Sequence, residues 1–160
     1  MSRYVEQAVD ALYTQINADI AGKLADVESD SSLSAGDLPA PTVVKYEATG
    51  LNTSPLIQIF EQGFSPDNEN GGIRSGVYAV PCKVIFTLRA DADLSAAEVK
   101  VRRYVDAIIR SVVNDTTLGG DAVGCEFRGA NAHVAIGDES TTRHGYEFDF
   151  DVYVQSMTGG

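Results

Sequence analysis

The sequence predicts an α+β fold: a single domain over residues 1–160, in which a mainly antiparallel β-sheet carries two amphipathic helices packed on one face. Two observations lead to this prediction. In two segments apolar residues recur every three or four positions, and in the segments after them apolar and polar residues alternate. A chain of 160 residues is long enough to bury a core without a disulfide or a metal.

The first element is expected to be an amphipathic helix over residues 3–27. Residues 28–41 then become small and polar and contain Pro39 and Pro41, so we expect a flexible loop there. The apolar stripe of the helix has spacings of three or four and consists of Val5, Val9, Leu12, Ile16, Ile20 and Leu24.

Three strand candidates follow, at Thr42 to Tyr46, Pro55 to Glu61 and Val77 to Ala90. Residues 62–76 lie before the third strand and hold four glycines and a proline. A polar connection of this length is either a functional element that orders on assembly or a flexible hairpin tip. Pro81 lacks a backbone N–H, so we expect its part of the third strand to be an edge or a bulge.

The second helix is expected to begin near Ser95, where Glu98 stands at the spacing of a capping box. It stops between Asn114 and Gly120, because Gly119 or Gly120 can adopt a positive φ. Its buried stripe consists of Val101, Val105, Ile108 and Val112.

Two long strands close the chain, at Val123 to Ile136 and Tyr146 to Gln155. The last one alternates strictly, as in a sheet with one covered face. The apolar phase of the preceding strand changes after Phe127, and Gly129 suits a bulge there. We expect residues 137–145 to form a flexible loop and residues 156–160 to form a frayed tail.

The composition is acidic, with 23 acidic and 12 basic residues and a net charge of −11. Such a charge repels nucleic-acid phosphates and anionic membranes. It suits either simple solubility or a surface along which DNA slides without sticking. The first residues do not read as a signal peptide, so we expect a chain that is cytosolic when made. Cys82 and Cys125 are then expected as reduced core residues.

Motifs for catalysis are not found in the sequence. The glycine-rich segment Gly71 to Gly76 lacks the Lys-Ser/Thr ending of a phosphate-binding loop and precedes a strand. His133, His144 and the two cysteines match no zinc-binding spacing. We therefore predict that the chain is not an enzyme and holds no cofactor or metal.

Three carboxylates, Glu147, Asp149 and Asp151, share one face of the last strand. Such a row could bind a divalent cation or act as an acid–base pair. A solvated face, or pairing with arginines of a neighbouring subunit, is the simpler interpretation, because no convergent histidine or further acid stands nearby.

The order of elements and four segments together resemble a known family. The segments are Val80 to Phe86, the helix Ala96 to Asn114, its stop Asp115 to Gly120, and the closing strand Tyr146 to Val154. In these the chain resembles the tail terminator (tail completion) proteins of tailed bacteriophages. The resemblance covers most of the chain, more loosely before residue 55. It consists of the order and boundaries of helices, strands and turns and includes no catalytic motif.

The resemblance implies a structural virion protein at the tail–neck junction, assembled in the host cytoplasm. Such a subunit forms a hexameric ring that caps the tail tube, ends its polymerisation and offers a surface for joining the head. Implied partners are further copies of the chain, the tail tube protein and a head–neck connector or stopper protein, with a tail sheath protein as a further candidate. Genomic DNA would pass through the lumen without sequence-specific binding. The candidate interface residues are Arg74, Arg102, Arg103, Arg110, Asp138, Glu139, Arg143, Glu147, Asp149 and Asp151.

Two alternatives remain open from the sequence. One is another virion connector, such as a head-completion stopper or a tail tube protein, since these share small α+β architectures and acidic charge. The other is a small acidic ligand-binding domain or enzyme that uses His133 and the three carboxylates of the last strand. Filament formation would distinguish a tube protein from a terminator.

Overall fold

The fold is α+β, as the sequence predicts, and is described by a computed structural model for residues 4–46, 54–63, 77–89, 94–136 and 142–155. In chain order the described elements are α1 (Tyr4–Asp30), β1 (Thr42–Val44), β2 (Leu56–Glu61), β3 (Val77–Arg89), α3 (Leu94–Val113), β4 (Gly124–Ile136) and β5 (Thr142–Gln155).

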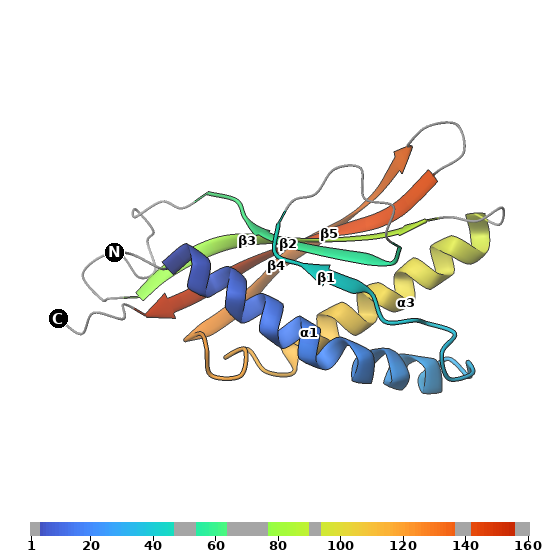
Figure 1. Cartoon of the computed structure of the whole chain (residues 1–160), viewed down its shortest axis with the longest axis horizontal. Coiled ribbons are helices and arrows are strands. Elements are labelled where there is room, and N and C mark those ends of the chain that lie inside the picture. The colour runs from blue at the N-terminus through green and yellow to red at the C-terminus, as the bar shows by residue number, and fades with distance from the viewer. Residues whose placement is uncertain (1–3, 47–53, 64–76, 90–93, 137–141, 156–160) are drawn as a thin grey trace.

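The five strands form one sheet in the order β1-β2-β3-β5-β4. β1 and β2 run parallel, and the other neighbours pair antiparallel. α1 and α3 lie along the same face of this sheet and contact each other (Figure 1). Both helices therefore cover one side, and neither covers the other side, which we call the open face.

The core lies between the helices and the middle of the sheet. Val80, Cys82 and Val84 of β3 pair with residues of β5 and are fully buried. Their partners on β5 are Val152, Phe150 and Phe148. Burial of each large apolar side chain contributes about 1.5–3 kcal/mol. These two rows of side chains on β3 and β5 are therefore the main source of cohesion between the sheet and the helix layer.

The apolar stripes of the two helices face this row, as expected. Leu12 and Ile16 of α1 and Ile108 of α3 are fully buried. α1 ends at Asp30, three residues later than the predicted end at residue 27. In the extension Glu28 is buried, and its carboxylate accepts a hydrogen bond from the Leu38 backbone N–H.

The segment after α1, predicted as part of a flexible loop over residues 28–41, is held by hydrogen bonds from both helices. The Leu38 backbone N–H donates to Glu28 Oε2 of α1 at 2.9 Å. The Tyr104 hydroxyl of α3 donates to the Pro39 carbonyl at 2.6 Å. Leu38 itself is buried. Burial raises the pKa of Tyr104, so its hydroxyl keeps the proton that it donates.

Pro81 was expected at an edge or a bulge. The prediction is wrong, because β3 is a central strand that lies between β2 and β5, and Pro81 pairs with Asp151. The Pro81 carbonyl accepts a hydrogen bond from the Gln62 backbone N–H at 2.8 Å, on the side of β2. The N and the carbonyl of one strand residue point to the same side. The missing N–H would therefore have pointed just past Glu61, where β2 ends.

The bulge predicted at Gly129 is confirmed, because the register of β4 against β5 shifts between Phe127 and Gly129. Gly129 has a φ of 146°, which favours glycine. β5 begins at Thr142, so the last residues of the predicted loop 137–145 belong to a strand. Residues 64–76, 137–141 and 156–160 of the predicted loops and tail lie outside the described residues, as does the side chain of Ser95.

The two cysteines are free. Cys82 is buried and Cys125 is half-buried. Burial raises the pKa of both thiols to about 12, so neither is a reactive thiolate at neutral pH.

The loop after α3 turns through three residues of positive φ, Leu118, Gly119 and Gly120. Sequence alone indicated only the glycines. Leu118 is 1% exposed, so burial of its side chain offsets the cost of the left-handed backbone. The Asp115 carboxylate holds the turn together by accepting hydrogen bonds from the backbone N–H groups of Thr117 and Gly119, each at 3.0 Å.

Replacing Tyr104 with Phe should lower the free energy of unfolding by about 1 kcal/mol, because the change removes the hydrogen bond to the Pro39 carbonyl. Urea denaturation of the two proteins measures this loss. Tyr153→Phe is the matched control: its hydroxyl donates to Glu126 at 3.2 Å in an exposed position, and its loss should be smaller. Equal losses of unfolding free energy in the two variants would contradict a stabilising role of the Tyr104–Pro39 hydrogen bond.

Asp115 makes the stability pH-dependent. Its hydrogen bonds with Thr117, and then with Gly119, lower its pKa below 3.8. A group with a lowered folded pKa stabilises the fold above its unfolded pKa, and the contribution is lost as the pH falls through the folded value. In urea denaturation, Asp115→Asn should therefore be less stable than the parent at pH 7, and the gap should narrow at pH 2.5. A gap that stays constant would contradict this role.

Candidate functional site

The open face of the sheet carries a cluster of charged side chains, which we call the open-face cluster. Strand alternation places these charges here, because their neighbours along β3 and β5 point into the core. Lys83 of β3 lies directly opposite Asp149 of β5 in the register. The cluster consists of Lys83, Glu126, Arg128, Glu147, Asp149 and Asp151.

Lys83 lies between two of the three predicted carboxylates. Its Nζ is 3.1 Å from Glu147 Oε2 and 3.9 Å from Asp149 Oδ1. The Lys83 side chain is 20% exposed, so solvent screens these two contacts less than a contact at the surface. The positive charge of this one lysine thus offsets the repulsion between two neighbouring carboxylates.

Arg128 engages the third carboxylate. Arg128 is the extra residue of the β4 bulge, since the register passes from Phe127 to Gly129 without a partner for it. Its Nε donates to Asp151 Oδ2 at 2.7 Å, and its Nη2 lies 3.4 Å from Glu126. The hydrogen bond with Asp151 is the main cause that raises the pKa of Arg128. The bulge therefore directs a cation onto the acidic row.

The cluster combines four carboxylates with two cations, which gives it a net charge of −2. Each of the three predicted carboxylates contacts Lys83 or Arg128. Among the described residues, no group of three or more His, Cys, Asp and Glu residues is placed to hold a metal ion. With its cations paired, this arrangement is suited to electrostatic contact with another surface. His133, the imidazole predicted for a ligand-binding site, pairs with Gly145 in the register of β4 and β5, but its side chain lies outside the described residues.

Three of the predicted arginines lie away from the acidic row, whereas strand alternation places Arg143 on the same face of β5 as Glu147. Arg102, Arg103 and Arg110 lie on α3, on the other side of the sheet from the open-face cluster. Arg110 connects the two helices, because its guanidinium contacts Asp30 of α1 at 2.9 Å and Asp106 at 3.0 Å. Arg143 lies on β5 opposite Arg89. Three further candidates lie outside the described residues: Arg74, Asp138 and Glu139.

α3 nevertheless has a surplus of positive charge. Its four basic residues, Lys100 and the three arginines, exceed Glu98 and Asp106 by two. Lys100 and Arg103 are three positions apart, so they share one side of the helix. α3 thus carries a net charge of +2 beside α1, whose six acidic residues and one lysine give −5, and the open-face cluster on the other side of the sheet carries −2.

Sequence analysis found the acids of this site but missed the cations that they contact. Lys83 and Arg128 stand far from the acids in the sequence, and only the pairing register brings them together. The one available signal was the position of Lys83 on the polar phase of an otherwise apolar strand.

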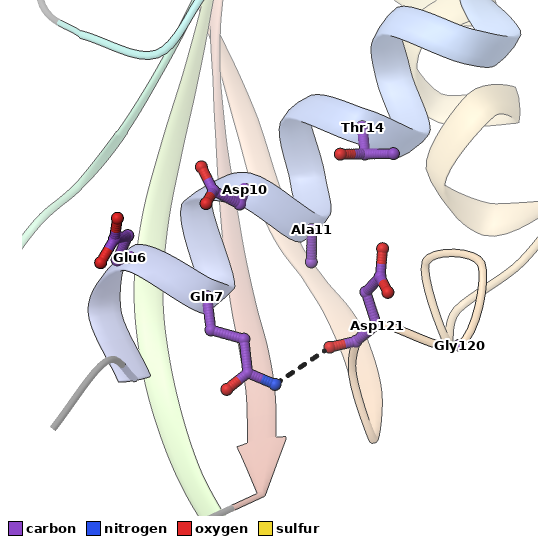
Figure 2. Close-up of a pocket in the computed structure, with 7 residues that line it drawn as sticks. All are labelled: Glu6, Gln7, Asp10, Ala11, Thr14, Gly120 and Asp121. Atoms are coloured by element: carbon purple, nitrogen blue, oxygen red, sulfur yellow. Dashed lines mark hydrogen bonds between the residues drawn. The ribbon is translucent and has the colours of Figure 1, made fainter. Parts of the chain in front are cut away.

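A groove of about 500 Å³ lies at the N-terminal half of α1. Figure 2 shows Gln7 reaching from the helix toward the loop of Gly120 and Asp121, where its Nε2 donates to the Asp121 carbonyl at 3.3 Å. Glu6 and Asp10 give the lining a negative character, although Asp10 pairs with Lys45 at 2.9 Å. Of the residues that the structure describes, those that line the groove include no histidine, cysteine or lysine, and their reactive groups are the Thr14 hydroxyl and the carboxylates of Glu6, Asp10 and Asp121.

Comparison with protein-family models gives no match, and comparison with curated proteins gives none either. Within the described part of the chain, no helix is both long enough and apolar enough to cross a membrane.

Replacing Lys83 with Met should destabilise the fold by about 1–2 kcal/mol, because it leaves two adjacent carboxylates without their shared cation. Lys45→Met is the matched control. Lys45 contacts the single carboxylate of Asp10, and both side chains are about half exposed, so a smaller loss than for Lys83→Met is expected. Thermal or urea denaturation measures both. A larger loss for Lys45→Met would contradict the central role of Lys83.

Proposed function

We propose that this chain is the subunit of a tail terminator ring of a tailed bacteriophage. Two supports favour the proposal. The first is the resemblance in Val80 to Phe86, Asp115 to Gly120 and the elements around them. The second is the opposite sign of the net charges of α3 and of the open-face cluster, and it carries the proposal because it concerns the contact that a ring requires.

A closed ring of identical subunits needs a heterologous contact, in which one face of a subunit meets a different face of the next. The surplus of two positive charges on α3 and the surplus of two negative charges in the open-face cluster lie on different faces. In a head-to-tail arrangement, α3 of one subunit faces the open face of the next. Opposite charges across a contact guide association and fix its orientation.

The proposed ring has six subunits and caps the tail tube. It ends polymerisation by covering the surface to which the next tube ring would bind, and its other side joins a head–neck connector or stopper protein. A sheath protein is a further partner in a contractile tail. DNA passes through the lumen, and a net charge of −11 disfavours tight contact with its phosphates. This role requires no catalysis, cofactor or metal, and it places the protein at the tail–neck junction of the virion.

A contact between α3 and the open face would also serve other virion connectors. The kind of oligomer that forms therefore distinguishes the proposals. A tail tube protein would stack into filaments, and a head-completion stopper would require its neck partner. A small ligand-binding domain would remain a monomer. Only the ring proposal links closed oligomers to charge complementarity between α3 and the open face.

The ring contact can be tested with two charge-reversed variants. Variant one, Lys100→Glu with Arg103→Glu, changes the charge of α3 from +2 to −2. Variant two, Glu126→Lys with Asp149→Lys, changes the open-face cluster from −2 to +2. Each variant alone then places like charges across the contact and should fail to form rings. An equimolar mixture restores opposite charges at every contact and should form rings in which the variants alternate.

Light scattering and negative-stain images measure these outcomes, with circular dichroism to confirm that each variant is folded. A matched control, Lys23→Glu with Lys45→Glu, changes charge by the same amount on α1 and the segment after it, and should assemble like the parent. The proposal fails if folded variants assemble alone as well as the parent does, or if the mixture of variants one and two does not regain rings.

A further inference from the structure

A small cavity of about 110 Å³ lies where the first turns of α3 meet β4 and β5. It is separate from the open-face cluster, because its strand residues belong to the face that the helices cover. The residues that matter for its chemistry are Glu98 and Arg102 of α3 and His144 and Tyr146 of β5.

His144 is the feature that points to an occupant. Its side chain is 93% buried, with 7% exposed. Its Nε2 is buried and has no hydrogen-bond partner among the described residues. A buried polar atom of this kind is costly unless a partner from outside the chain satisfies it. The cavity beside the ring provides the space for that partner.

Arg102 supplies a second donor at the mouth of the cavity. Its guanidinium is 3.8 Å from Glu98 Oε2, and the two side chains are 69% and 57% exposed, so this pair is weak and easily exchanged. A guanidinium has five N–H donors in a planar fork that suits a carboxylate. An incoming carboxylate would replace Glu98 as the partner of Arg102 and reach the imidazole of His144 with its other oxygen.

The volume agrees with such an occupant. A cavity of about 110 Å³ has room for a small polar group such as a carboxylate with its attached carbon. Val101, Ala132 and Tyr146 give the lining an apolar side.

We propose that this cavity is a carboxylate-binding site, in which His144 Nε2–H and the Arg102 guanidinium donate to the two oxygens of one carboxylate. The carboxylate is either a free small molecule or an Asp or Glu side chain of a second copy of the chain. The site can be tested apart from the proposed ring. Arg102 is one of the four basic residues of α3, but the charge-reversed variants leave both Arg102 and His144 unchanged.

NMR of the histidine rings tests the site directly, because the chain has only two histidines. His144→Gln identifies the signal of His144, and the other signal, from His133, serves as the internal reference. Sodium acetate is added at constant pH against sodium chloride of the same ionic strength. We expect a saturable shift of the His144 signal with acetate alone, and binding at least fivefold weaker in Arg102→Gln. Arg103→Gln is the matched control and should bind as the parent does.

A second measurement identifies the source of the carboxylate. The His144 signal is followed as the protein concentration rises without acetate. A shift that Arg102→Gln abolishes would support the site and assign the carboxylate to a second copy, whereas a response to acetate alone would support the site and assign it to a free ligand. The proposal is overturned if neither titration shifts the signal, or if sodium chloride or Arg102→Gln reproduces the response of the parent to acetate.

Discussion

The pairing of β3 with β5 is the constraint on which both faces of the molecule depend. The two strands stay in register over the whole of Val77–Arg89. That register places Phe148 and Phe150 beneath the helices and, in the same step, Glu147 and Asp149 beside Lys83. A slip of one residue would move every side chain of a strand to the other face. The apolar core and the charged open face therefore arise from one pairing, and a change that weakens it would damage both.

The sequence was sufficient for features that depend on local periodicity or on one special residue. The stripes of α1 and α3, the alternation of β5 and the bulge at Gly129 follow from side-chain spacing and backbone freedom, which act over a few residues. Pro81 shows the limit of such reasoning, since a proline in a central strand is tolerated only because β2 ends beside it. The contacts of Lys83 and Arg128 with the acidic row also depend on pairing between distant segments, which periodicity does not specify.

The charges of the open face acquire a different meaning once their contacts are known. The three carboxylates of β5 contact cations of their own subunit. An approaching subunit would therefore meet the net negative charge of the whole cluster and not three unpaired carboxylates. Such a surface orients the partner subunit and speeds association. The rate should depend on salt, because charges separated by more than about 10 Å are screened at 0.1 M salt. The covered face offers a different chemistry, with the buried imidazole of His144 beside an exposed arginine. The two sites are separated by the sheet and can be altered independently.

The native mass of the unaltered chain tests the central claim most directly. Light scattering should be recorded over a range of protein concentrations and salt, with negative-stain images of the same fractions. The account predicts closed rings of one size, six subunits each, whose population falls as salt rises because the contact between α3 and the open face is electrostatic. Open filaments, or a monomer at every concentration and salt, would contradict it.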